Sequence, residues 1–139
     1  MLSRMVESRG ERHYMESRDL AIISARAMDM RKGTKITVLK LEDLTVLTDY
    51  FVVGTGATRV QTQAMADSVE DELIKEGIRP GRIEGLQEGR WILMDYGQVI
   101  IHIFLEDERS FYGLERLWAD APALPMEEIF PDRDADDEV

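Results

Sequence analysis

Residues 90–105 constrain the fold more than any other part of the sequence. Two runs of alternating aliphatic, aromatic and polar residues flank Asp95-Tyr96-Gly97-Gln98, a pattern typical of a β-hairpin with a tight turn. A two-residue turn at Tyr96-Gly97 would place Trp91 opposite His102, and a four-residue loop keeps the same register. A three-residue loop would change this pairing but not the alternation within each strand.

The two faces of this hairpin differ in character, since neighbours along a strand alternate and opposed residues share a face. One face is wholly aliphatic and is expected to form the core under amphipathic helices: Ile92, Met94, Val99, Ile101, Ile103 and Leu105. The other face mixes aromatic, polar and charged groups: Trp91, Leu93, Asp95, Ile100, His102 and Phe104. Large aromatics on a sheet are more often core, and a lone histidine is more often structural. Because one core face is already accounted for, we interpret the mixed face as a recognition surface.

The remaining periodicity predicts one α/β domain with a mixed β-sheet and helices packed on one face. One helix is expected over residues 17–31, with Ser17 as N-cap and Gly33 at its end. A second is expected over 58–76, where Thr58 and Gln61 match a capping box. Strands are expected over residues 35–41 and 50–53, and Gly54-Thr55-Gly56 is expected to stop the second of them. Residues 78–84 are expected to form an edge strand, since Pro80 and Gly81 disfavour a central position. A further helix is expected over residues 107–118.

The ends of the chain differ from its middle. Residues 1–16 are expected to be a flexible extension, residues 17–122 the folded domain, and residues 123–139 an acidic, disordered and solvated tail. The net charge is −11, and no basic stripe suited to a phosphate backbone occurs. An acidic domain is better suited to a basic protein partner. Without a signal or transit peptide pattern or a membrane-length apolar run, we expect a cytoplasmic location.

Composition and spacing argue against a catalytic or metal site. Cysteine is absent, and the two histidines, His13 and His102, are far apart, which indicates no transition-metal site. Gly54-Thr55-Gly56 before a helix invites a phosphate-loop interpretation, but the lysine of a P-loop and the third glycine of a dinucleotide fingerprint are missing. No pair of carboxylates lies within a strand, and no nucleophile elbow occurs. We therefore predict no enzyme activity and no cofactor.

An ordered set of short motifs resembles the ribosomal silencing factor family, also called the Iojap family. The resemblance covers about residues 17–122 and rests on these segments: Asp49-Tyr50-Phe51, Gly54-Thr55-Gly56, Glu84-Gly85, Gly89-Arg90-Trp91, Asp95-Tyr96-Gly97, His102-Ile103-Phe104, Arg109-Ser110-Phe111-Tyr112 and Leu114-Glu115-Arg116-Leu117-Trp118. It implies a nucleotidyltransferase-like fold without catalytic carboxylates. It also implies binding to the large ribosomal subunit at ribosomal protein uL14, which sterically blocks association with the small subunit and represses translation.

The family's interaction surface, carried onto this sequence, implies partner-binding roles for Trp91, Asp95, Tyr96 and His102. Tyr50, Arg109 and Tyr112 are further candidates, although Arg109 could instead pair with a nearby acid, and Tyr112 and Trp118 could anchor the last helix. The resemblance also implies a homodimer when the protein is free. Two alternatives stay open: an assembly factor of the large subunit, and a residual nucleotide-binding or nucleotidyltransferase enzyme.

Overall fold

The structure is a computed structural model of the chain. It describes all residues except 1–3, 9–10, 114–115, 117 and 134–139, and for 4–8, 11–14 and 110–112 only the backbone is considered. Five strands form one mixed sheet in the order β3-β4-β7-β6-β5. They are β3 (Thr34–Lys40), β4 (Tyr50–Gly56), β5 (Arg82–Glu84), β6 (Trp91–Asp95) and β7 (Val99–Leu105). β4 and β7 pair in parallel, and the other neighbours are antiparallel.

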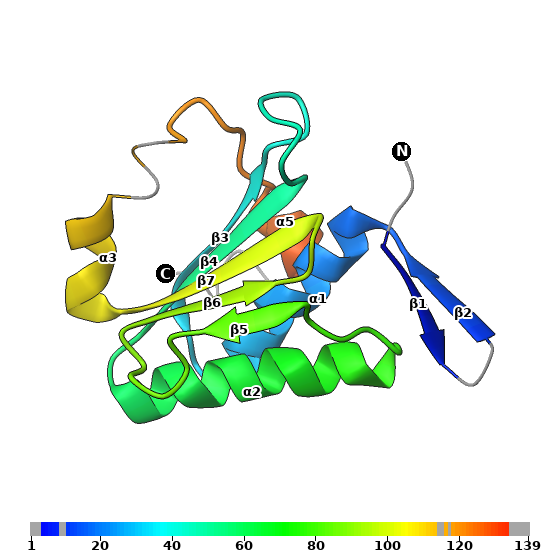
Figure 1. Cartoon of the computed structure of the whole chain (residues 1–139). Coiled ribbons are helices and arrows are strands. Elements are labelled where there is room, and N and C mark those ends of the chain that lie inside the picture. The colour runs from blue at the N-terminus through cyan, green and yellow to red at the C-terminus, as the bar shows by residue number, and fades with distance from the viewer. Residues whose placement is uncertain (1–3, 9–10, 114–115, 117, 134–139) are drawn as a thin grey trace.

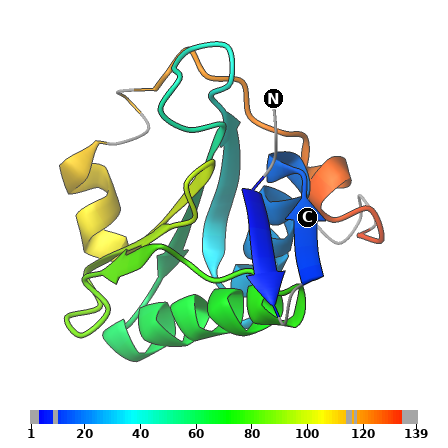
Figure 2. The same ribbon diagram turned by 45° about the vertical axis from the view of Figure 1, so that its right-hand side comes forward.

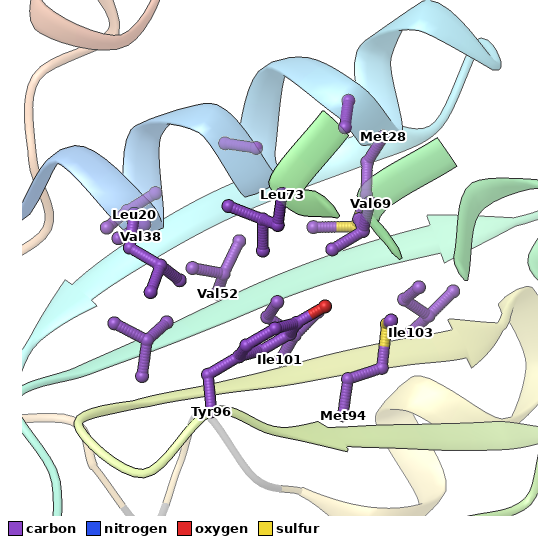
Figure 3. Close-up of a cluster of buried hydrophobic side chains, with 14 of the residues drawn as sticks. Leu20, Met28, Val38, Val52, Val69, Leu73, Met94, Tyr96, Ile101 and Ile103 are labelled. Carbon is purple, nitrogen blue, oxygen red and sulfur yellow. The ribbon is translucent and has the colours of Figure 1, made fainter. Parts of the chain in front are cut away.

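Two helices, α1 (Ser17–Met30) and α2 (Arg59–Lys75), cover one face of this sheet (Figures 1 and 2). Figure 3 shows the core between the layers, where Leu20, Met28 and Leu73 from the helices meet side chains of the central strands. The aliphatic face of the β6–β7 hairpin contributes five fully buried side chains to this core: Ile92, Met94, Val99, Ile101 and Ile103. The predicted mixed sheet with helices on one face is therefore confirmed, whereas the nucleotidyltransferase likeness stays a prediction.

The helix starts follow the predicted signals in one case and not in the other. At α2, Thr58 is the N-cap and accepts a hydrogen bond from the Gln61 amide at 3.1 Å, as the capping box predicts. At α1, the N-cap is Glu16, which makes no side-chain cap bond. Ser17 donates instead to Asp49 at 2.8 Å, because its hydroxyl faces the loop before β4. The prediction of Ser17 as N-cap is therefore wrong.

Gly54-Thr55-Gly56 lies within β4 and does not stop it. These glycines lie where the helices approach the sheet most closely. A Cβ atom at Gly54 would fall 2.6 Å from the Met28 sulfur, and one at Gly56 would fall 2.8 Å from the Thr62 methyl group. The segment is strand backbone packed under two helices, which removes the geometric basis for a phosphate loop.

The register of the β6–β7 hairpin differs from the predicted one by two residues. Trp91 lies opposite Phe104, and His102 lies opposite Leu93. The cause is the turn, whose two central residues are Gly97 and Gln98. Gly97 has a φ of 84° at the first central position, which is typical of a type II′ turn. A shift of two residues preserves the side-chain alternation, so both predicted faces survive.

The segments flanking the sheet also depart from expectation. β5 lies at the edge of the sheet, as predicted. The helix predicted over residues 107–118 differs, because α3 (Glu106–Tyr112) is followed by Gly113 as its C-cap, with a left-handed φ of 61°. Residues 114–115 and 117 of the helix predicted over 107–118 lie outside the described residues. The predicted N-terminal extension forms a separate antiparallel hairpin, β1 (Arg4–Ser8) with β2 (Glu11–Met15), and its flexibility stays a prediction (Figure 2).

The expectation of a solvated tail from residue 123 is wrong for its first part. The Lys40 amide donates to the Pro122 carbonyl and the Leu124 amide to the Val38 carbonyl, so this segment pairs with the free edge of β3. α5 (Met126–Ile129) then packs beside α1, with Ile129 fully buried. Apolar side chains placed among the acids explain the packing, and residues 134–139 lie outside the described part of the chain.

Candidate partner-binding face of the sheet

The sheet face turned away from α1 and α2 is called the outer face here. It comprises Trp91, Leu93, Asp95, Ile100, His102 and Phe104 of the hairpin, together with Leu39, Phe51 and Val53 of the neighbouring strands. Phe104, Phe51 and Val53 form a second small hydrophobic cluster, on which Trp118 and Ala121 pack. The outer face is therefore part core and part surface, because Trp91, Leu93, Asp95 and Ile100 keep intermediate exposure.

His102 lies at the centre of an aromatic group on this face. The Trp91 indole N–H donates to His102 Nδ1 at 3.0 Å. Phe51 meets the imidazole edge-on with ring centroids 4.7 Å apart, and Phe104 stacks on Trp91 at 5.2 Å. These contacts hold the imidazole ring in one orientation, which makes its second nitrogen a fixed feature of the face.

The protonation state of His102 follows from its burial. Only 4% of the residue is exposed, and desolvation lowers the pKa of the imidazole to about 4. The ring is thus neutral near pH 7. Because Nδ1 accepts from Trp91, the remaining proton lies on Nε2. Nε2 has no hydrogen-bond partner among the described residues, so the face holds a buried donor without an acceptor.

The edge of the outer face at β5 is charged. Asp95 accepts from the Gly97 amide at 2.8 Å through Oδ1, and its Oδ2 lies 3.4 Å from Arg82 Nε. Arg82 also contacts Glu84 at 2.7 Å. One guanidinium is thus shared by two carboxylates, which leaves an excess of negative charge at this edge. Exposed ion pairs of this kind contribute little to stability, so the carboxylates remain available to a basic partner.

A glycine holds Trp91 close to β5. Gly85, with a φ of 76°, lies directly against the Trp91 carbonyl, and a Cβ atom there would collide with that oxygen. Only glycine combines this left-handed backbone with such a close approach at no steric cost. The Glu84-Gly85 motif therefore positions the backbone that carries the indole.

Two of the predicted site residues belong to the core. Tyr96 is fully buried between the sheet and the helices (Figure 3), because the alternation that buries Ile92 and Met94 continues through it. Tyr50 is buried in the same core, where burial and then Glu42 raise the pKa of its phenol to about 12. Both side chains are therefore covered in the free chain, and their partner-binding role stays a prediction. Their alternation with Met94 and Val52 was the sequence signal for burial.

Arg109 and Tyr112 have different outcomes. Arg109 is buried and donates through Nη1 to the Lys35 carbonyl and, at 2.7 Å, to the Thr55 hydroxyl. It therefore fastens α3 to β3 and β4, and its pairing with a nearby acid stays a prediction. The Tyr112 side chain lies outside the described residues. The structure thus brings Trp91, Asp95 and His102 together on one face. Phe51 joins them there, and the alternation of side chains along its strand, where Tyr50 faces the core, could have indicated this.

The described residues contain no group of three histidine or acidic side chains able to hold a metal ion. A hollow of about 440 Å³ lies between α1 and the C-terminal segment, away from the outer face. There Arg133 contacts Asp29 at 2.9 Å and stacks on Phe130. Separately, among the described helices none is long and apolar enough to span a bilayer.

Two crystal structures share this arrangement. A protein from Chromobacterium violaceum matches with a TM-score of 0.73 and 33% identity, covering 76% of this chain and 88% of its own. A protein from Bacillus halodurans matches with a TM-score of 0.70 and 31% identity, covering 78% and 99%. The fold is therefore the small mixed α/β domain of these two bacterial proteins.

The family model "Ribosomal silencing factor during starvation" matches residues 14–138. The chain belongs to this family, and the match extends beyond the segment 17–122 that carried the resemblance. A ribosomal silencing factor of Bacillus subtilis is 37% identical over 113 residues, which cover 81% of this chain and 96% of the relative. Protein Iojap of Zea mays chloroplasts is 29% identical over 111 residues, covering 80% and 48%. The mouse protein named for mitochondrial assembly of the large ribosomal subunit is 34% identical over 74 residues, covering 51% and 32%.

Proposed function

We propose that this protein binds the large ribosomal subunit at ribosomal protein uL14, blocks association with the small subunit and thereby represses translation. Family membership carries the proposal, since the relatives matched over most of their length are ribosomal silencing factors. The role is steric rather than catalytic. The free protein is proposed to be a cytoplasmic homodimer.

The chemistry of the outer face supports a protein partner. Trp91 supplies a rigid, half-buried aromatic surface of the type that dominates binding hot spots. Asp95 and Glu84 supply negative charge that complements a basic ribosomal protein. His102 supplies a neutral Nε2–H donor, without an acceptor among the described residues, that suits a carbonyl or carboxylate of the partner. Three unlike groups on one face allow recognition by shape, charge and hydrogen bonding together.

The direct experiment measures subunit joining. Separated ribosomal subunits are mixed with increasing amounts of the full chain, and joining is followed by light scattering and by sedimentation. We expect a dose-dependent loss of joined ribosomes and co-sedimentation with the large subunit alone. Normal joining at saturating protein would refute the proposal.

A substitution on the outer face tests where binding occurs. Trp91→Phe keeps the stacking on Phe104 but removes the indole N–H and part of the apolar surface. Asp95→Asn removes the charge and keeps an oxygen that can accept from the Gly97 amide. Both variants should stay folded and bind the large subunit more weakly. Asp71→Asn, on α2, is a charge control whose affinity should not change.

A second candidate, an assembly factor of the large subunit, rests on the name of the mouse relative. It would use the same outer face but act on immature subunits. Pull-down with this chain discriminates the two, because an assembly factor enriches immature large subunits and a silencing factor binds mature ones. The residual nucleotide-binding enzyme is tested by calorimetry with nucleoside triphosphates and magnesium. We expect no heat of binding, since Gly54-Thr55-Gly56 is packed within β4.

A further inference from the structure

The loop between β3 and β4, residues 42–49, exposes three apolar side chains. Val46 is 97% exposed, Leu47 80% and Leu44 46%. Leu44, Val46 and Leu47 are called the apolar loop below. Single exposed apolar residues are ordinary, but three within four positions on one loop are typical of an interaction site. Figures 1 and 2 both show this loop at the end of the molecule opposite α2.

Hydrogen bonds at the base of the loop fix its position. The Leu41 amide donates to the Asp49 carbonyl at 2.7 Å, which closes the loop. The Asp49 and Tyr50 amides both donate to the Gln98 carbonyl, at 2.8 and 3.1 Å. Ser17 holds the Asp49 carboxylate from α1. The apolar side chains are thus presented by an anchored frame, and a preorganised loop loses less entropy when it binds.

The loop is continuous with the outer face. Leu41, at its start, is fully buried in the cluster formed with Phe51 and Phe104. At its end, the loop is bonded to Gln98 in the turn that follows Asp95. A partner seated on the outer face near Asp95 would therefore reach the apolar loop without a gap.

The charges beside the loop select the class of partner. Glu42 and Asp43 are exposed and directly precede Leu44. Carboxylates repel the phosphate backbone of ribosomal RNA, and apolar side chains gain nothing from it. An acidic rim around an apolar tip instead fits a basic protein surface that contains an apolar recess.

We propose that the apolar loop inserts into an apolar recess of the basic large-subunit protein that the outer face binds. This inference rests on the proposed function and adds a second contact to it. Leu47 and Val46 act as anchors, and the carboxylates of Glu42 and Asp43 meet cationic side chains around the recess. The two contacts together fix the orientation of the protein on the subunit.

The test compares the full chain with the double variant Val46→Ser/Leu47→Ser. The matched control is Val60→Ser, which replaces a 76% exposed valine on α2, at the other end of the molecule. Dissociation constants are measured by co-sedimentation with purified large subunits, and circular dichroism checks the fold. Loss of two anchors should weaken binding about tenfold or more. The control should bind like the parent chain.

Each other outcome overturns the inference in its own way. Unchanged binding of the double variant removes the loop contact and leaves the proposed function intact. Failure of the parent chain itself to bind removes both. An equal loss of binding to protein-free ribosomal RNA would assign the loop to RNA. Conversion of a dimer to a monomer in sedimentation equilibrium, with subunit affinity unchanged, would assign it to a second copy of this chain.

Discussion

Acid should destabilise this protein through His102. Burial lowers the pKa of this imidazole from 6.5 to about 4 in the folded state. In the unfolded chain the ring is solvated and titrates near its ordinary value of about 6.5. Between these two values the unfolded state binds more protons than the folded state, so the free energy of unfolding falls as pH falls. The contribution is fully present above about pH 6.5 and is lost as pH approaches about 4.

The size of the effect follows from the difference between the two pKa values. One pKa unit corresponds to about 1.4 kcal/mol, so the full loss is about 3 kcal/mol. At about pH 5 the loss has reached about 2 kcal/mol, because the unfolded ring is almost fully protonated and the folded ring is not. Against a total stability of about 5–15 kcal/mol for a domain, this change is easily measured.

The assay is urea unfolding at about pH 7.5 and about pH 5, which bracket the ordinary titration of histidine. His102→Gln serves as the comparison, because an amide does not titrate and its oxygen can accept from the Trp91 N–H. The parent chain should lose about 2 kcal/mol more than this variant on acidification. His13→Gln gives the contribution of the other histidine. An equal loss in the parent chain and His102→Gln would refute the reasoning, as would an imidazole that titrates at its ordinary value in NMR.

Three further substitutions test how α3, α5 and the Gly85 turn are held against the rest of the domain, each by urea unfolding. Arg109→Met removes the bonds to Lys35 and Thr55 and should cost about 2 kcal/mol, whereas an unchanged midpoint would contradict the anchoring of α3. Ile129→Ala should lower the free energy of unfolding by about 2 kcal/mol or more, because the side chain is fully buried. A negligible effect would show that α5 is not packed on α1. Gly85→Ala should cost about 1–3 kcal/mol and shift Trp91 fluorescence, and an unaltered spectrum would show that the close approach to Trp91 is relaxed.

The hairpin shows why sequence alternation predicts faces better than it predicts register. Every strand assigns its side chains to two faces with a period of two, so an error of two residues leaves the faces unchanged. The register itself depended on which pair of residues forms the turn. Gly97 takes a positive φ at the first central position, which moves the turn one residue towards Gln98. The pairing of Trp91 with Phe104 could not be read from the alternation alone.

The other differences between expectation and structure have equally local causes. Tyr96 was assigned to the partner because it stands in a motif, although the alternation of its own strand places it with Met94 in the core. The tail was judged by its acidity, although Ile129 supplies enough apolar surface to hold α5 on α1. The exposure of Val46 had no sequence signal, because a short apolar run between two strands has the same composition whether it is buried or exposed.

His102 links the stability of the free protein to its proposed binding role. Among the described residues its Nε2–H donor has no acceptor; such a buried donor costs about 1–3 kcal/mol, which an apolar side chain of similar size would avoid. The structure nevertheless fixes this donor with Trp91 and surrounds it with Phe51 and Phe104. A fixed donor of this kind is useful where a partner supplies the missing acceptor. The hydrogen bond formed on binding then adds to the affinity for that partner, and partners without the acceptor bind less tightly. Proteins commonly give up stability at functional sites in this way. The aromatic cluster therefore favours a binding face over a second core, even though most of its rings are buried.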